Sequence, residues 1–324
     1  MTATTTKRRL AASAVAAALG ALAAGCSSGS DDETEATAGG FPSTIVLGAI
    51  PAENSTDLAA GYDPIVKMLE AETGATVEVS QASDYAGVIE GLIAGNVDMA
   101  FLGSFAYVIA TENDADITPL GAVTAAKDEE PGYFSYGIAQ GDNAEISDLA
   151  DFAGKDVCFV DPGSTSGFLY PSAGLIEAGV VSTATESAMA EALNPIFAGA
   201  HDASALAVKN GDCDAGFAMQ SMVDRTLIES GELAEGDLKT VWESPQISGS
   251  LFVARDGLGE DVVAELTTLM TEKANADYLL GEGFCEGDCL LTDEDAWGVK
   301  PATDADYDGV REVCRLTESA ACEG

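Results

Sequence analysis

The 324-residue chain contains few basic residues and very little histidine. Lys and Arg together number 14 against 55 Asp and Glu, which gives a net charge of −41, and there is a single His. An acidic surface of this kind repels the phosphates of nucleic acid, so we expect no nucleic-acid partner. The lone His and the lack of paired Cys-x-x-Cys motifs argue against a metal site. We expect neither a metal nor a cofactor.

The chain also lacks a hydrophobic run long enough for a permanent membrane span. Its apolar stretch, residues 10–22, follows the basic run Lys7-Arg8-Arg9 and ends shortly before Cys26. This order is typical of a secretory signal with a lipoprotein-type cleavage site, although Ala23 stands where such sites usually have Leu. We therefore expect a signal peptide at 1–25 and a lipid on Cys26, which holds the protein on the extracytoplasmic face of the cell membrane. The alternative is simple secretion with Cys26 as an accidental thiol.

A segment without any hydrophobic pattern follows. Residues 26–40 are rich in Ser, Gly, Asp, Glu and Thr, so they bury too little apolar surface to fold and are expected to form a flexible tether. Removal of the signal leaves 11 basic against 55 acidic residues, a net charge of about −44. This charge repels anions at long range, and salt screens the repulsion beyond about 10 Å. An anion site in this chain must therefore depend on close hydrogen-bond donors.

Six cysteines remain after the signal. An even number in an exported protein favours disulfides and leaves their connectivity open. We expect two local bridges and one between neighbouring strands: Cys285 with Cys289, Cys314 with Cys322, and Cys158 with Cys213.

Apolar strand patterns alternate with helix patterns from residue 41 onward. Strands are predicted at 44–48, 75–80 and 97–102, with helices at 58–73 and 84–94 between them. This alternation indicates parallel or mixed sheets with helices on both faces. In such sheets, ligands bind beyond the carboxyl ends of the strands.

The alternation resumes in a second unit after residue 131. In chain order we predict strand 131–139, helix 146–152, strand 157–160, a helix from 164 to about 179, strand 194–197, helix 203–209, strand 214–219, helix 221–229, strand 240–244, strand 251–254, one helix over 261–280 and a last helix over 307–316. Two units joined by two crossings predict a two-lobed α/β fold with the ligand cleft between the lobes. We assign 41–134 and 245–324, with the Cys-rich tail, to lobe 1 and 135–244 to lobe 2.

The most informative run is residues 161–171, Asp-Pro-Gly-Ser-Thr-Ser-Gly-Phe-Leu-Tyr-Pro, between a strand and a helix. The hydroxyls of Ser164, Thr165 and Ser166 are suited to cap a helix start. The N–H groups of that first turn, together with the helix dipole, also bind anions. A capped helix start without a ligand is the simplest interpretation of the run taken alone.

Two enzyme motifs come close to this run and do not fit. A nucleophile elbow has Ser at the centre of Gly-x-Ser-x-Gly, whereas Thr165 is at the centre here. No Gly-Lys-Ser/Thr follows, so the run is not a nucleotide-binding P-loop. An enzyme that uses Ser164 or Ser166 with His201 is a remaining alternative, but only Asp202 is at hand to orient the histidine. We expect a binding protein and not an enzyme.

Five runs, in this order along the chain, resemble the phosphate/phosphite/phosphonate-binding proteins of ABC importers. They are residues 83–89, 131–135, 161–171, 199–208 and 242–245. The resemblance covers about 45 to 255 and leaves out the Cys-rich tail. It implies a type II-like periplasmic-binding-protein fold, an ABC permease as partner and a monomeric receptor.

The resemblance also implies the binding residues. By the family's pattern, Ser164, Thr165 and Ser166 donate hydrogen bonds to the phosphonate oxygens, His201 contacts the anion, and Tyr85 and Tyr133 line the cleft. These residue types suit the task, because a tetrahedral oxyanion needs several converging donors.

Two departures from the family bear on the ligand. Members that select an aminoalkyl phosphonate have acids where this chain has Ser221 and Ser250. We therefore expect a small phosphorus oxyanion without a charged substituent: phosphite, methylphosphonate or phosphate. Asp202 and Asp224 are nearby acids that are able to compensate. A receptor of the same fold for sulfate, a sulfonate or a larger organic solute is the alternative, with Phe105, Tyr107, Tyr133, Phe134 and Tyr136 as lining.

Overall fold

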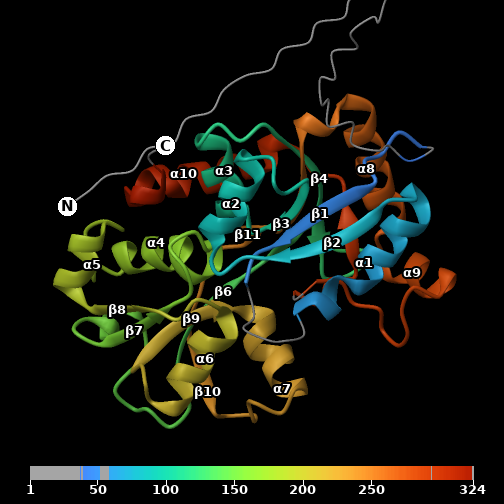
Figure 1. Ribbon diagram of the computed structural model, residues 1–324. Coiled ribbons are helices and arrows are strands. Elements are labelled where there is room, and N and C mark those ends of the chain that lie inside the picture. The colour runs from blue at the N-terminus through green and yellow to red at the C-terminus, as the bar shows by residue number, and fades with distance from the viewer. Residues whose placement is uncertain (1–36, 38, 52–57, 293, 323–324) are drawn as a thin grey trace, which may run out of the picture. The chain divides into compact units, whose positions relative to one another are not determined.

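A computed structural model describes residues 37, 39–51, 58–292 and 294–322. The expected signal peptide, Cys26 and most of the tether lie outside these residues. The described residues form one compact unit, built on a six-stranded sheet and a five-stranded sheet, each covered by helices (Figure 1). No helix in the described part of the chain is both long and apolar enough to cross a membrane.

The six-stranded sheet has the order β13-β4-β12-β3-β1-β2. Its strands are β1 (Thr44–Ala49), β2 (Thr76–Gln81), β3 (Met99–Leu102), β4 (Ile117–Thr124), β12 (Leu251–Arg255) and β13 (Gly298–Lys300). β1 runs parallel to β2 and β3, whereas β12 and β13 pair antiparallel to their neighbours. The carboxyl ends of β1 and β3 therefore lie at one edge of the sheet.

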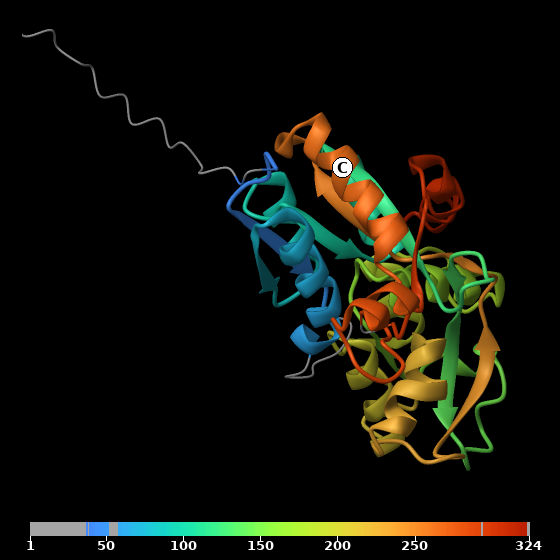
Figure 2. The same cartoon turned by 90° about the vertical axis from the view of Figure 1, so that its right-hand side faces the viewer.

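Both faces of this sheet are buried. In β3, Met99 and Phe101 belong to one apolar cluster, and Ala100 and Leu102 belong to another, as the alternation of side chains along a strand requires. Helices α1 (Leu58–Thr73) and α8 (Glu260–Lys273) cover the first face and contact each other (Figure 2). Helices α2 (Tyr85–Ile93) and α3 (Ser104–Glu112) cover the second.

The five-stranded sheet has the order β10-β6-β9-β7-β8. Its strands are β6 (Ser135–Gln140), β7 (Asp156–Phe159), β8 (Asn194–Phe197), β9 (Ala215–Met219) and β10 (Leu238–Glu243). Its helices are α4 (Tyr170–Glu177), α5 (Glu186–Ala192), α6 (His201–Asn210) and the short α7 (Leu227–Glu229). β7 is parallel to β8 and β9, so their carboxyl ends also share an edge, and α4 and α6 begin there.

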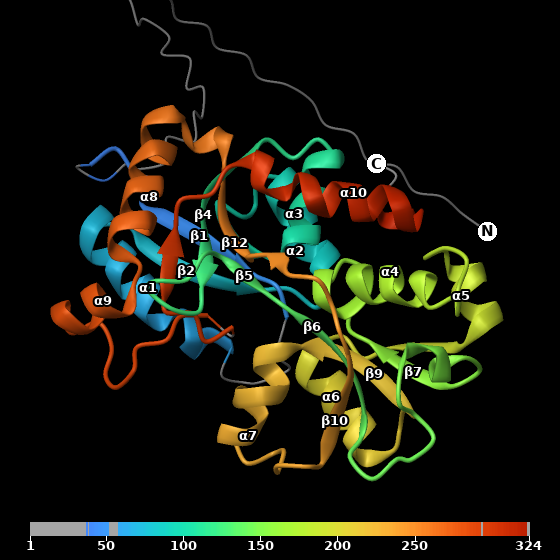
Figure 3. The same cartoon turned by 180° about the vertical axis from the view of Figure 1, so that it is seen from behind.

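The chain passes between the sheets twice. It leaves the first sheet through β5 (Gly132–Tyr133) into β6, and it returns from β10 through β11 (Ile247–Ser248) into β12 (Figure 3). β5 and β11 pair antiparallel, with Ile247 opposite Tyr133.

Three disulfides confirm the expected pairings. Cys158 in β7 is bonded to Cys213 just before β9, and the two local bridges join Cys285 to Cys289 and Cys314 to Cys322.

The prediction of one helix over 261–280 is wrong. The chain breaks at Ala274, and α9 (Ala276–Glu282) begins after Asn275, whose side-chain oxygen accepts the Tyr278 N–H at 3.0 Å. Asn275 also forms a β-bridge with Gly298. A side-chain cap and a long-range bridge therefore outweigh the helical pattern of the sequence. Smaller differences are the start of α6 at His201 and the appearance of β11 in a predicted loop.

Helix α3 and strand β4 are among the elements that were not predicted from the sequence. Six of the nine residues of α3 are buried, so its apolar residues show no 3.6-residue period. β4 contains Pro119 and Gly121, residues that weaken a strand pattern.

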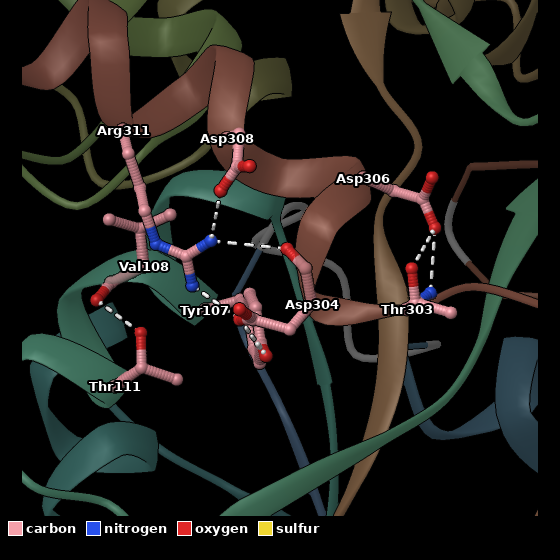
Figure 4. A network of polar contacts seen from close by, with 8 residues as sticks. All are labelled: Tyr107, Val108, Thr111, Thr303, Asp304, Asp306, Asp308 and Arg311. Atoms are coloured by element: carbon pink, nitrogen blue, oxygen red, sulfur yellow. Dashed lines mark hydrogen bonds and ion pairs between the residues drawn. The ribbon is translucent and has the colours of Figure 1, made fainter.

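A polar network holds the C-terminal segment on α3 (Figure 4). The Tyr107 hydroxyl donates to Asp304 Oδ1 at 2.7 Å, and Arg311 of α10 (Asp308–Thr317) pairs with both Asp304 and Asp308. The rings of Tyr107 and Tyr307 lie 4.9 Å apart. The segment after β13 is thus anchored to the helix whose first turn faces the site described next.

Candidate ligand-binding site

All six predicted binding residues line one narrow cavity of about 10 Å³. The lining comprises Ile50, Tyr85, Gly103, Tyr133, Ser164, Thr165, Ser166, His201, Met219, Ser250 and Glu294. Tyr85, Thr165 and His201 are each the first residue of a helix or helical turn, and Gly103 immediately precedes α3. Several helix N-termini therefore converge at the carboxyl ends of strands from both sheets, an arrangement that favours an anion.

The first turn after β7 is shaped by Ser164 and Gly167. Ser164 Oγ accepts the Gly167 N–H at 3.0 Å, and the Leu169 N–H bonds to the Ser164 carbonyl, which makes the turn Thr165–Leu169 π-helical. A Cβ on Gly167 would lie 2.3 Å from Val160 Cβ, so only glycine fits there. Because Ser164 uses an oxygen lone pair for this cap, its hydroxyl hydrogen remains available for another acceptor.

Thr165 links this turn to α3. Gly103 supplies no capping side chain, and Thr165 Oγ1 instead accepts the Phe105 N–H at 2.8 Å. Ser104 Oγ donates to the same oxygen at 3.4 Å. The Thr165 hydroxyl, which is predicted to donate to an anion, thus also caps α3, a helix that packs on the other sheet.

Tyr133 and Ser166 complete the hydroxyl cluster. The half-buried Tyr133 lies beside the side chains of Thr165, Ser166 and Ser250, and desolvation of its phenol there raises its pKa. Tyr133 therefore keeps its hydrogen and acts as a donor at neutral pH. Ser135 Oγ donates to the Ser166 carbonyl at 2.5 Å and fixes the turn from β6.

Tyr85 is buried at the start of α2, and its backbone N–H donates to the carboxyl of Asp161. Asp161 also accepts the Gly163 N–H at 2.7 Å, and burial raises its pKa. Asp161 is absent from the cavity lining and serves to hold the loop ahead of Ser164.

His201 is held in one tautomer. The backbone N–H of Met219 donates to its Nδ1 at 3.0 Å, so Nδ1 carries no hydrogen and Nε2 does. Complete burial lowers the His201 pKa to about 3. At neutral pH the side chain is therefore an uncharged donor through Nε2.

Glu294 is the site residue that the sequence analysis missed. It follows α9 in the Cys-rich tail, and its carboxyl accepts a hydrogen bond from Ser250 Oγ. Burial raises its pKa to about 7. Because Ser221 and Ser250 replace the family's acids, we expected a site without a carboxyl group. This expectation is wrong at Ser250, because its hydroxyl donates a hydrogen bond to the carboxyl group of Glu294. Nothing in the local sequence pattern marks Glu294.

A larger cavity of about 570 Å³ adjoins the first and shares Tyr133, Met219 and Glu294 with it. Its lining includes Ser221 and three acids, Glu129, Glu130 and Asp224. Asp202 lines neither cavity; its Oδ1 accepts the Ala203 N–H at 2.6 Å. Of the two acids considered for compensation, only Asp224 lines one of the two cavities.

Only some of the aromatic residues considered for a larger ligand line a cavity. Tyr133 and Phe134 line the larger cavity, but Phe105 and Tyr107 are buried in the apolar core. The Tyr136 hydroxyl donates to Asp224 at 3.0 Å.

Residues 47–307 match the model of the periplasmic substrate-binding proteins of phosphonate ABC transporters. The chain is 61% identical over 312 residues to the phosphate-import protein PhnD of Mycolicibacterium smegmatis, with 96% of this chain and 97% of that protein covered.

Solved structures show the same fold. A binding-protein component of a phosphonate ABC transporter from Pseudomonas aeruginosa has a TM-score of 0.69 at 26% identity, covering 85% of this chain and 86% of that chain. PhnD1 of Prochlorococcus marinus, solved with methylphosphonate, has a TM-score of 0.68 at 20% identity, covering 86% and 99%. The two-lobed periplasmic-binding-protein fold is thereby confirmed. Proteins of this kind bind solutes for ABC importers and are not enzymes. The chain belongs to the phosphonate-binding family of periplasmic substrate-binding proteins of ABC transporters.

Proposed function

We propose that this receptor captures phosphate, or an equally small phosphorus oxyanion such as phosphite or methylphosphonate, through the residues that line the narrow cavity. The observation that carries the proposal is the convergence of hydroxyl and N–H donors there. Ser164, Thr165, Ser166 and Tyr133 supply hydroxyls, and His201 supplies Nε2–H. Hydrogen bonds to a charged oxygen are about twice as strong as neutral ones.

Phosphate is the favoured member of this class. The cavity of about 10 Å³ has space for at most about one water-sized sphere, so the donors must separate to admit even a compact ion. A ligand with an organic arm needs further displacement. The relative that is 61% identical carries the name of a phosphate-import protein.

Short-range donors must overcome the charge of the whole chain. The net charge of −41 repels an approaching anion, but salt screens this field beyond about 10 Å. Inside the cavity the converging donors and helix N-termini act at contact distance in a poorly solvated site, where they are strongest.

The proposal includes movement of two lobes, 41–134 with 245–324 and 135–244, about the crossings at β5–β6 and β10–β11. The Thr165 hydroxyl, after β7 of one sheet, bonds to Phe105 after β3 of the other, so the donors come from both proposed lobes. A ligand that contacts both lobes favours the closed arrangement.

The protein works on the extracytoplasmic side and passes its ligand to an ABC permease, as its family does. We further propose that it is a monomer anchored by a lipid on Cys26. Mass spectrometry of the membrane-extracted protein tests the anchor, because a diacylglycerol on an N-terminal Cys26 adds a defined mass.

Calorimetric titration of the purified protein tests the ligand. Phosphate, phosphite, methylphosphonate, aminoethylphosphonate and sulfate are titrated separately under identical conditions. Tight binding of phosphate with weak binding of aminoethylphosphonate supports the proposal. Binding of sulfate or of a larger organic anion in preference to every phosphorus oxyanion contradicts it.

A further inference from the structure

Glu294 places an acid inside a site that is otherwise built from donors. It lines both the narrow cavity and the larger one. In the part of the chain that the structure describes, Ser250 is the only recorded hydrogen-bond partner of its carboxyl group. One carboxyl oxygen is therefore committed to Ser250, and the other is available to a ligand.

Among the residues that the structure describes, no basic side chain pairs with this carboxyl. The lining of the larger cavity includes the cation Arg225, but its Nε donates to the carboxylate of Asp295 at 2.9 Å. The titratable groups that face Glu294 are Tyr133 and Tyr307, with His201 across the narrow cavity. Glu129, Glu130 and Asp224 lie in the larger cavity. All of these are neutral or negative at neutral pH.

A bare carboxylate cannot lie against a fully deprotonated oxyanion in such surroundings. Two like charges at contact distance raise the pKa of one of them until a proton stays between the two groups. Either the Glu294 carboxyl or the ligand supplies that proton. Burial already raises the Glu294 pKa to about 7, so the protein holds the proton readily below neutral pH, and the ligand must bring it at higher pH.

On the basis of the proposed phosphate site, we propose that Glu294 distinguishes ligands by their protonation state. One proton is shared between the free Glu294 carboxyl oxygen and a ligand oxygen, so the site selects oxyanions that carry a P–OH group. Glu294 is then a specificity-determining residue, which accepts from the acidic hydrogen of the ligand while the other lining residues donate.

The common oxyanions differ in this hydrogen. Phosphate keeps a P–OH group throughout the neutral and mildly alkaline range. Phosphite and methylphosphonate lose theirs as the pH rises through neutrality, and sulfate has none. Phosphate therefore binds above neutral pH without taking up a proton, whereas sulfate binds only if Glu294 supplies one, which costs about tenfold in affinity for each pH unit above its pKa.

The test is a calorimetric pH series on the full protein and on E294Q, with phosphate and sulfate between about pH 6 and pH 9. In the parent, we expect the phosphate-to-sulfate affinity ratio to rise by about tenfold per pH unit above neutrality. Glutamine carries no charge and donates through its amide, so E294Q should show a flat ratio that is about 100-fold lower at alkaline pH. E130Q is the matched control, because Glu130 is exposed in the larger cavity, and it should retain the parental ratio.

Each result has one meaning. A pH-independent ratio in the parent overturns the inference and does not depend on the variant's folding, which thermal unfolding checks. A parental ratio in E294Q also overturns it. Preferential binding of aminoethylphosphonate that is lost in E294Q makes Glu294 an ammonium partner and overturns it as well. If the parent binds none of the phosphorus oxyanions, the proposed function fails and the inference fails with it.

Discussion

The Nδ1 atom of His201 accepts a hydrogen bond from the backbone N–H of Met219 at 3.0 Å. This contact joins the first residue of α6 to the last residue of β9. It fixes the tautomer in which Nε2 carries the hydrogen, and His201 lines the narrow cavity.

Two substitutions separate the roles of the two ring nitrogens. In H201N the amide oxygen replaces Nδ1 and keeps the Met219 contact, but no donor reaches the position of Nε2. In H201Q the longer amide restores a donor near Nε2. We expect H201N to weaken phosphate binding by about 1.5–3 kcal/mol and H201Q to weaken it less, as measured by calorimetry. Equal losses in both variants contradict this assignment.

The pH dependence of stability reflects two opposing groups. The His201 pKa is about 3 in the folded protein, below its usual 6.5, so the unfolded chain takes up a proton first and acid lowers stability. The Glu294 pKa is about 7, above its usual 4.5, so the folded protein takes up a proton first and acid raises stability. Between about pH 4.5 and 6.5 the two effects oppose each other.

If one of the two groups is removed, the pH dependence of stability should show the contribution of the other group alone. Relative to the parent, E294Q should lose about 1–2 kcal/mol more on acidification from about pH 7.5 to 5.5, and H201Q should lose about 1–2 kcal/mol less. Urea unfolding of the ligand-free proteins at the two pH values measures both changes. Identical pH profiles for the parent and both variants disagree with the assigned protonation states.

Thr165 caps α3 and, in the proposed function, also donates to the ligand, so T165V should affect both stability and binding. Valine leaves the buried Phe105 N–H without its acceptor, at a cost of about 1–3 kcal/mol in the free energy of unfolding. Phosphate binding should weaken by at least about 30-fold, because the ligand loses one hydroxyl donor and the first turn of α3 loses the oxygen that caps it. T165S keeps the hydroxyl and is the control. A T165V variant that binds phosphate as the parent does places the site elsewhere.

The sequence predicted the parts of the site that depend on local order. The Ser164–Gly167 run follows an apolar strand and carries a helix-capping pattern, and His201 is identified by its place among the family's runs. Glu294 could not be predicted in this way, because it lies in an aperiodic loop. The long-range pairing of β13 with β4 helps to bring that loop to Ser250. The buried α3 was missed for a related reason, since a helix covered on nearly every side has no polar stripe.

The Tyr107 hydroxyl bond to Asp304 should contribute measurably to stability. Tyr107 is buried and the bond is 2.7 Å long, so Y107F should lower the free energy of unfolding by about 1 kcal/mol. Y278F is the matched control, because the Tyr278 hydroxyl bonds to Glu72 at 2.8 Å on the surface. We expect that change to cost less than about 0.5 kcal/mol. Chemical unfolding of both variants checks the difference, and equal costs disagree with an anchoring role for the network.

Gly167 tests whether close backbone packing forms the anion-binding turn. Alanine there places its Cβ 2.3 Å from Val160 Cβ, too close for either strand or turn to stay in place, so G167A should cost about 2–3 kcal/mol. Because the shift displaces Ser164 and Thr165, phosphate binding should weaken as well. G281A is the control: Gly281 lies in α9 with no atom within 4 Å of an added Cβ, and alanine there should stabilise the protein by up to about 1 kcal/mol. Parental stability and affinity in G167A, measured by urea unfolding and calorimetry, show that the turn is not confined by Val160.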